Sequence, residues 1–296
     1  MPLLRLSISF AAREAVPSFR NLNLAAAHPS CPLLPPPPPL PPLERMPPDY
    51  ESQAYWNARF EDERHFEWLG DGADTLLPIL RTDLLASLSS ARSPAPPCLT
   101  SPTVDPAARA QPPPRLLHIG AGTSSLSERL RELYHELFGP AVDERALVHA
   151  DYAAGLVARR RAAELARGGR MRWACVDALD WAQAQALLEG GVGGRAFAAV
   201  VDKSTSDAVS CGEDLAFGAP TSRARLHPAL RRGPSAGGAA GLVLEPMALF
   251  ALHLAALVRP GGLWIALTFS AARFEFLVDA AHHYVVLLRR TDACLQ

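Results

Sequence analysis

The sequence predicts an α/β fold in which a doubly wound, mostly parallel sheet is covered by helices on both faces. Three observations predict it. Short, nearly continuous apolar runs alternate with helical patterns, as strands and crossover helices do in parallel sheets. The first run ends in a glycine turn at Gly120 and Gly122, and the next three runs each end in an aspartate. Because ligands of such sheets bind at the carboxyl ends of the strands, these residues form the predicted site.

Composition sets broad limits on the class of protein. The chain has 296 residues, of which 49% are hydrophobic and 20% charged, enough for a sizeable core. Its formal net charge of -1 gives no reason to expect non-specific nucleic-acid binding. The five cysteines are scattered without a metal-ligand or disulfide pattern, so we interpret them as free thiols. No apolar run reaches the roughly 20 uninterrupted residues of a membrane helix, which predicts a soluble protein.

Residues 1–48 are predicted to be a disordered, proline-rich segment that precedes the domain. Residues 1–30 carry three arginines against a single acid, which is also typical of a mitochondrial targeting segment. Residues 31–48 hold ten prolines, a composition typical of an extended linker. Three interpretations stay open: targeting, a disordered tail, or an upstream extension of a protein that starts at Met46.

The domain is predicted to span residues 49–296. It begins with an aromatic-rich stretch, residues 50–69, that is typical of a surface helix packing on the core through its rings. A second amphipathic helix is predicted over residues 76–89. Residues 92–114 hold eight prolines, and residues 212–241 are rich in glycine, proline and arginine. Both stretches are therefore predicted to be flexible loops.

The core elements follow in order after residue 115. Beyond the first strand, which precedes Gly120, apolar runs predict strands over residues 146–150, 171–176, 196–201, 263–269 and 283–289. Helical spacing of apolar residues predicts helices over residues 126–137, 155–166, 181–188 and 246–258. Residues 259–262, Arg-Pro-Gly-Gly, are predicted to be a stop and turn before the last long strand.

The stretch 115–127 places a strand, a glycine turn and a helix start in succession. Bare backbone at Gly120 and Gly122, next to the N-terminus of a helix, allows a ligand to approach closely. On its own this arrangement is shared by nucleotide-binding folds with many chemistries. A nicotinamide dinucleotide is disfavoured, because Ser125 replaces the third glycine of that fingerprint and Asp151 follows Gly120 by 31 residues.

The acids that follow the next three strands narrow the range of ligands that the site could bind. Asp151 ends the second strand, Asp177 the third and Asp202 the fourth. A carboxylate after the second strand accepts hydrogen bonds from both hydroxyls of a ribose, and one after the third accepts from the amino group of an adenine. Together with the glycine turn they predict a pocket for an adenosine. The alternative for each aspartate is a cap of the following helix or a surface turn.

Three motifs resemble one branch of the class I S-adenosylmethionine-dependent methyltransferases. Residues 117–127, Leu-His-Ile-Gly-Ala-Gly-Thr-Ser-Ser-Leu-Ser, resemble motif I of that class. Residues 55–68 contain Y-W-x-x-R-F followed by F-E-W, and residues 201–209, Val-Asp-Lys-Ser-Thr-Ser-Asp-Ala-Val, are similar to the D-K-G-T-L-D-A signature of the branch. The branch holds lysine methyltransferases of elongation factor 1-alpha and the citrate synthase lysine methyltransferase. The resemblance covers residues 49–290 and implies the class I methyltransferase fold.

The resemblance implies S-adenosylmethionine as the cofactor and protein-lysine methylation as the activity. The residues that it implies in cofactor binding are Tyr55, Trp56, Arg59, Gly120, Gly122, Asp151, Tyr152, Asp177, Ala178 and Asp202. Arg59 is expected to pair with the carboxylate of the cofactor. Asp202 and Lys203 are the candidate catalytic residues, at the mouth where the methyl group is delivered. No metal site is predicted.

Two departures from the branch bear on activity. Ser204 and Ser206 stand where the branch has Gly and usually Leu or an aromatic residue, and a Ser is strained where a Gly tolerates positive φ. Near the end of the chain, residues 278–281 replace a strand and a loop of the branch, so the sheet is predicted to be one strand short at its C-terminal edge. A small-molecule methyltransferase and a non-catalytic scaffold with this fold therefore stay open as alternatives.

The expected partner is a protein substrate, with elongation factor 1-alpha-like proteins and mitochondrial enzymes as candidates. No nucleic acid, membrane or second copy of the chain is expected as a partner. Free thiols favour a cytoplasmic protein, and the N-terminal segment keeps the mitochondrion as the alternative. Nothing in the sequence identifies the methyl acceptor.

Overall fold

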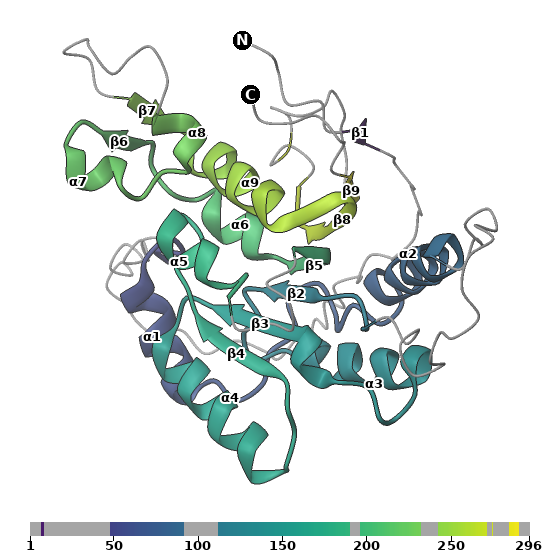
Figure 1. Cartoon of the computed structure of the whole chain (residues 1–296). Coiled ribbons are helices and arrows are strands. Elements are labelled where there is room, and N and C mark those ends of the chain that lie inside the picture. Colours follow the sequence, from purple (N-terminus) through teal and green to yellow (C-terminus); the bar gives the residue numbers. More distant parts are fainter. Residues whose placement is uncertain are drawn as a thin grey trace, which may run out of the picture.

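A computed structural model describes residues 7–8, 48–91, 112–189, 196–231, 242–270, 274 and 284–289 of the chain. Its central sheet has seven strands: β1 (Ser7–Ile8), β2 (Leu116–Ile119), β3 (Leu147–Asp151), β4 (Arg172–Cys175), β5 (Phe197–Lys203), β8 (Val258–Thr268) and β9 (Tyr284–Arg289). They lie in the order β1-β9-β8-β5-β2-β3-β4 (Figure 1). The strands from β8 to β4 are parallel, and β9 runs antiparallel to both of its neighbours. The strand order reverses between β2 and β5, which confirms the predicted doubly wound α/β fold.

Helices cover both faces of the sheet: α2 (Leu76–Ala91), α3 (Leu126–Phe138), α4 (Ala154–Ala166), α5 (Trp181–Ala186) and α9 (Pro246–Leu257). Side chains alternate along β2, so Leu116 joins the core under α2 and α3, while Leu117 joins the core under α5 and α9. Figure 1 accordingly shows α3 and α9 on opposite sides of the sheet. The ends of these helices lie within two residues of the predicted ends.

The N-terminal part of the domain is less helical than predicted. The helix α1 (Gln53–Asp62) starts where the Ser52 side chain accepts a hydrogen bond from the Tyr55 N–H, and it ends before Glu63. The remaining aromatic residues follow in irregular backbone, which includes a left-handed residue at Leu69, with φ of 57°. We call residues 48–75 the cover segment. The prediction of a single helix over residues 50–69 was wrong, because the apolar rings of its second half do not repeat at helical spacing.

The strand β8 begins earlier than the sequence predicts. Val258 pairs with Phe197 and Leu263 pairs with Ala199, so residues 259–262 bulge out opposite a single residue of β5. Gly261 takes a left-handed φ of 71°, and Gly262 lies close to the Ala198 carbonyl. The predicted turn at residues 259–262 is therefore a bulge within one strand, with its glycines providing the conformations that the bulge requires.

Part of the predicted flexible loop 212–241 is ordered. Its described residues form β6 (Leu215–Phe217), α7 (Pro220–Arg223) and α8 (Pro228–Arg231), and β6 pairs antiparallel with β7 (Leu242–Leu244). Phe217 and Leu226 pack with Leu249 of α9 in a small core of their own. We call residues 211–245 the insertion. Its polar composition concealed this local core, while residues 232–241 lie outside the described part.

At one edge of the sheet β8 pairs with β9, and β9 pairs with β1, with Ser7 opposite Arg289. Ser7 and Ile8 are thus strand residues in the described part of the chain. Residues 278–281, on which the prediction of a missing strand rests, lie outside the described residues. Residues 9–47, and residues 92–111 of the predicted first loop, lie outside the described residues. Within the described ranges, no helix combines the length and the apolar character that crossing a membrane requires.

Candidate ligand-binding site

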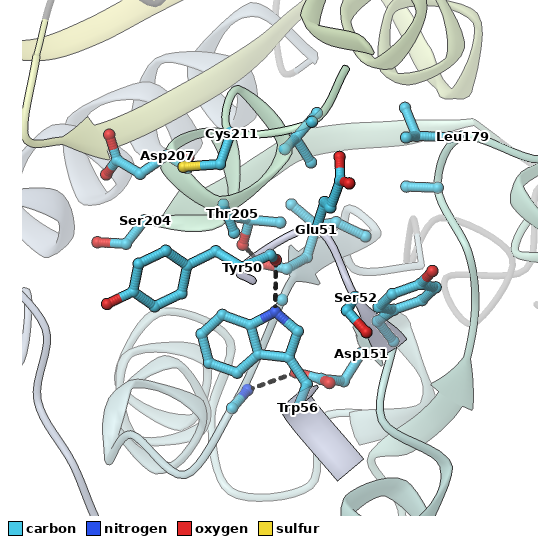
Figure 2. Close-up of a pocket in the computed structure, with 18 of the residues that line it drawn as sticks. Tyr50, Glu51, Ser52, Trp56, Asp151, Leu179, Ser204, Thr205, Asp207 and Cys211 are labelled. Atoms are coloured by element: carbon cyan, nitrogen blue, oxygen red, sulfur yellow. Dashed lines mark hydrogen bonds between the residues drawn. The ribbon is translucent and has the colours of Figure 1, made fainter. Parts of the chain in front are cut away.

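A cavity of about 800 Å³ lies at the carboxyl ends of β2, β3, β4 and β5. Its wall is completed by the cover segment, the short helix α6 (Thr205–Val209) and the insertion. Figure 2 shows Tyr50, Trp56 and Asp151 converging with Thr205 and Asp207 on this space. Eight of the eleven predicted site residues line it: Trp56, Gly120, Gly122, Asp151, Tyr152, Asp177, Ala178 and Lys203. Tyr55, Arg59 and Asp202 are not among the lining residues.

The glycine turn has the left-handed backbone that its sequence suggests. Gly120 has a φ of 61° and Gly122 a φ of 55°. A side chain at Gly120 would collide with Thr205, whose hydroxyl donates to the Ile119 carbonyl at 2.9 Å. A methyl group added at Gly122 would have Phe60 Cζ as its nearest neighbour, at 3.8 Å. Gly120 is therefore required by packing against α6, whereas at Gly122 the left-handed conformation alone favours glycine.

Asp151 links the end of β3 to the glycine turn. Its Oδ2 accepts a hydrogen bond from the Gly122 N–H at 2.8 Å (Figure 2), and its Oδ1 accepts from the Ala153 N–H at 2.9 Å. The side chain is buried, and this burial raises the pKa of the carboxyl in spite of the two backbone hydrogen bonds. Both bonds come from the backbone, so the position of the carboxylate is fixed by the strand and the turn.

Asp177 follows β4 and interacts with the insertion. Its Oδ1 accepts from the Leu179 N–H at 2.9 Å, and its Oδ2 lies 2.6 Å from Nη2 of Arg225. Arg225 also approaches Asp180 at 3.4 Å and lines the cavity. The sequence analysis missed Arg225, because it lies in a stretch interpreted as a flexible loop and is 48 residues from its partner.

Asp202 lies below the cavity. It is fully buried, and its Oδ1 accepts from the backbone N–H groups of Thr205 at 2.9 Å and Ser206 at 3.3 Å. Burial, with a contribution from the nearby Asp207 charge, raises its pKa to about 7. The carboxyl group therefore caps α6, which is the alternative role that the sequence analysis gave to such aspartates.

Lys203 contacts the cover segment with its whole ammonium group. Its Nζ lies 2.6 Å from Glu67 Oε2 and donates to the carbonyls of Trp68 at 3.2 Å and Gly70 at 2.8 Å. The side chain is 4% exposed. Lys203 thus reaches the wall of the cavity, but its charge and its three N–H groups are directed toward residues 67–70.

Glu67 occupies the N-terminus of α3. Its carboxylate accepts from the Ser125 N–H and hydroxyl, each at 2.7 Å, and from the Ser124 hydroxyl at 2.8 Å. Burial alone would raise the pKa of Glu67, but the hydrogen bonds from Lys203, Ser125 and Ser124 outweigh it and lower the pKa to about 2. Glu67 stood within the recognised F-E-W motif, yet its sequence position did not reveal a partner 136 residues away.

The other predicted residues of the cover segment lie around one arginine. The Arg59 guanidinium donates to Glu63 at 2.8 Å and to the Tyr55 hydroxyl at 2.9 Å. It also lies 5.6 Å from the ring centre of Trp56 and 5.0 Å from that of Trp68. In this arrangement Glu63 takes the place beside Arg59 that was expected for the carboxylate of a cofactor.

Ser204 has the strained backbone that its sequence position suggests. Its φ of 64° and ψ of 8° place it in the left-handed region directly before α6. Such a conformation costs a residue with a side chain about 1 kcal/mol relative to glycine. Ser206, the second departure from the branch, is fully buried and donates its backbone N–H to Asp202. Among the described residues no group of His, Cys, Asp or Glu is arranged to hold a metal ion.

The fold and the cavity define an α/β protein with a candidate ligand site at the switch point of a doubly wound sheet. The chain is 31% identical, over 172 residues, to methyltransferase srdJ from Neurospora crassa, an alignment that covers 56% of this chain and 57% of that protein. The chain thus spans little more than half the length of this relative. No family profile matches the chain.

Solved structures give weaker likenesses. TrmN from Thermus thermophilus is 17% identical, over 74% of this chain and 51% of that one, with a TM-score of 0.34. An O-methyltransferase family protein from Burkholderia thailandensis is 15% identical, over 75% of this chain and 60% of that one, with a TM-score of 0.29. Because these scores are low, the fold assignment rests on the strand order and connections of the chain itself.

Proposed function

We propose that this protein is an S-adenosylmethionine-dependent methyltransferase that modifies a lysine of a protein substrate. The observation that carries the proposal is the cavity at the switch point of the sheet, where the glycine turn and Asp151 meet. The similarity to methyltransferase srdJ supports methyl transfer. The motif in residues 117–127 supports the cofactor, and the resemblance of residues 55–68 and 201–209 to a branch of protein-lysine methyltransferases supports lysine as the acceptor.

In this proposal Asp151 holds the ribose of the cofactor. Its oxygens already accept the Gly122 and Ala153 N–H groups, with a further backbone contribution from Tyr152, and a carboxylate offers about four acceptor sites in all. At least one site therefore remains for a ribose hydroxyl. Asp177 marks the adenine end, where Val176, Ala178 and Leu179 offer apolar contact to the base.

The charge of the cavity suits a cationic acceptor. Among its described lining residues eight are acidic and two are basic, and both bases, Lys203 and Arg225, are already paired with carboxylates. A concave surface with this balance attracts a lysine side chain electrostatically. A neutral small molecule gains no electrostatic attraction from this excess of acidic residues.

The bound cofactor would supply an activated methyl group on a sulfonium, so the chain has to align the acceptor and exclude water. The lysine must lose its proton before transfer, although the pKa of a free lysine is near 10.4. The rings of Tyr50, Trp68 and Phe269 line the same cavity and desolvate an amine there, which lowers its pKa. This route needs no dedicated general base, in keeping with the position of Asp202 outside the lining.

Calorimetric titration with S-adenosylmethionine tests the first half of the proposal. Asp151→Asn should weaken binding at least about tenfold, because a charged hydrogen-bond acceptor for the ribose is lost. Glu132→Gln, which changes an acid on α3 that is 66% exposed, is the matched control and should bind like the unaltered chain. Absence of binding by the unaltered chain would refute the proposal.

Transfer of a labelled methyl group in extracts tests the second half. The label should enter protein bands, and mass spectrometry should locate it on lysine. If the label is found only in the small-molecule fraction, the methyl acceptor is a small molecule and not a protein lysine. Cofactor binding without transfer to either fraction would identify a non-catalytic scaffold, for which the strained Ser204 loop gives a structural reason.

A further inference from the structure

The contact between Lys203 and Glu67 joins three parts of the protein that are distant in sequence. Lys203 ends β5, Glu67 belongs to the cover segment, and the serines that bind Glu67 precede α3. The Lys203 side chain is 4% exposed and that of Glu67 is 20% exposed. Each charge therefore lies in a poorly hydrated place, where only a complete set of hydrogen bonds makes its burial favourable.

All hydrogen-bonding capacity of the Lys203 ammonium is used within the chain. A lysine ammonium has three N–H donors and no acceptor. The Lys203 group has three acceptors within hydrogen-bond distance, namely Glu67 Oε2, the Trp68 carbonyl and the Gly70 carbonyl. No donor is left over for a cofactor or an acceptor amine while the cover segment is in this position.

The Glu67 carboxylate is equally well satisfied. It accepts from Lys203, from both Ser125 donors and from the Ser124 hydroxyl. Its negative charge also lies at the N-terminus of the 13-residue helix α3, where the helix dipole favours an anion. Ser125 makes no side-chain cap of its own, so Glu67 satisfies this end of the helix together with the Ser124 hydroxyl, which accepts from the Leu126 N–H at 3.1 Å.

The backbone of the cover segment is bent around the Lys203 ammonium. Leu69 and Gly70 take consecutive left-handed φ values of 57° and 80°, and this turn directs the Trp68 and Gly70 carbonyls toward Nζ. The turn also sets the Trp68 ring, which contacts Tyr50 at 6.2 Å and Phe269 at 6.0 Å between ring centres. These three rings line the cavity.

We infer that Lys203 is a positioning residue that fastens the cover segment over the cavity through Glu67, Trp68 and Gly70, and that it does not react with the acceptor. The inference rests on the proposed function for what the cavity binds. It assigns the Lys of the D-K motif a role in building the aromatic wall of the acceptor end. We call the contact of Lys203 with Glu67, Trp68 and Gly70 the latch. Removal of the latch loosens the aromatic wall and exposes the cavity to water.

Hydrogen exchange and cofactor titration, measured on the same full-length variants, test this inference. Lys203→Met removes the ammonium and keeps a side chain of similar length, while Glu67→Gln keeps the shape of the other partner and removes its charge. Arg81→Met is the matched control, because it breaks an exposed ion pair with Glu136 that joins α2 and α3 away from the cavity.

In Lys203→Met the amides of residues 66–70 should exchange at least about tenfold faster, while those of β2 and β5 keep their protection. The dissociation constant for S-adenosylmethionine should rise at least about fivefold. Glu67→Gln should change both quantities in the same direction and by less, and Arg81→Met should change neither.

Unchanged hydrogen exchange at residues 66–70 in Lys203→Met would overturn the inference. If that variant had also lost turnover, Lys203 would instead take part directly in methyl transfer. If Lys203→Met does not fold, the same criterion applies to Glu67→Gln. Failure of the unaltered chain to bind S-adenosylmethionine would refute the proposed function only, because the exchange measurements decide the latch without any ligand.

Discussion

The turn side of the cavity, formed by Gly120, Gly122 and Asp151, is held differently from its cover side. On the turn side the hydrogen bonds of Asp151 come from backbone N–H groups, at 2.8 and 2.9 Å, within the strands and the turn that follows them. On the cover side the contacts are side-chain ion pairs, such as Lys203 with Glu67 at 2.6 Å and Arg225 with Asp177 at 2.6 Å.

This difference separates a fixed surface from a movable one. The Asp151 carboxylate is bound by backbone N–H groups next to the ends of β2 and β3, so its position changes only when those strand ends open. Ion pairs between a sheet and a covering segment break without loss of the sheet, because each partner belongs to a different element. Under the proposed function the ribose site would therefore be already formed, whereas the wall around the acceptor would depend on the position of the cover segment and the insertion.

Acidification should give the largest loss in the free energy of unfolding, through two buried histidines on the strands of the turn side. His118 and His149 are paired residues of β2 and β3, the strands that lead to the glycine turn and to Asp151, and both are fully buried with their Nδ1 atoms 3.3 Å apart. Burial, helped by the charges of Lys203 and Arg160 and opposed by that of Glu67, lowers the pKa of His118 to about 3. Burial, followed by the neighbouring His118, also lowers the pKa of His149.

The sign of the effect follows from proton binding. Between about pH 6.5 and pH 3 the unfolded chain protonates these histidines and the folded chain does not, so the free energy of unfolding falls as the pH falls. For His118 alone the loss across this window is on the order of 4 to 5 kcal/mol. Urea unfolding at several pH values measures it. His118→Leu should show a shallower dependence, and an identical slope would contradict the assignment.

Gly120→Ala should lower the free energy of unfolding by a smaller amount, through the glycine turn. The new methyl group meets Thr205 and must also adopt a φ of 61°, so we expect a loss of about 3 kcal/mol in the free energy of unfolding. Gly168→Ala is the matched control, because Gly168 has a φ of 69° with no atom near its methyl position. Its expected loss is about 1 kcal/mol. Equal losses in chemical unfolding of the two variants would show that Thr205 moves aside freely.

Ser204→Gly should give the smallest effect and the opposite sign. Glycine relieves the left-handed strain at φ of 64°, so the variant should be more stable by about 1 kcal/mol, less a few tenths for the greater freedom of its unfolded chain. Thermal unfolding measures the change. A loss of stability would mean that the Ser204 hydroxyl makes a contribution that exceeds the strain.

The sequence was most informative where the structure is set by local pattern. The strands β3 and β5 and the helix that starts at Leu126 follow from apolar periodicity and capping, which act within a few residues. The left-handed backbone of Ser204 was expected on a different ground, namely that the resembled branch has Gly at this position.

The sequence was least informative where two distant charges meet. Nothing near Lys203 indicates Glu67, and nothing near Asp177 indicates Arg225, because each pair is formed by the tertiary arrangement of separate elements. For the same reason Arg59 was expected to bind a ligand carboxylate, while its nearest acid, Glu63, lies one helical turn away. Periodicity places a residue on an element but does not select its partner.

The five tryptophans of the chain divide into two groups with different surroundings. Trp173, Trp181 and Trp264 are buried in the cores on either side of the sheet. Trp56 and Trp68 line the cavity and belong to the cover segment. A quencher dissolved in water does not reach the buried group. If a bound ligand protects tryptophan fluorescence from such a quencher, the protected residues are therefore the two in the cavity. The protein thus carries an intrinsic optical probe for cavity occupancy that requires no label.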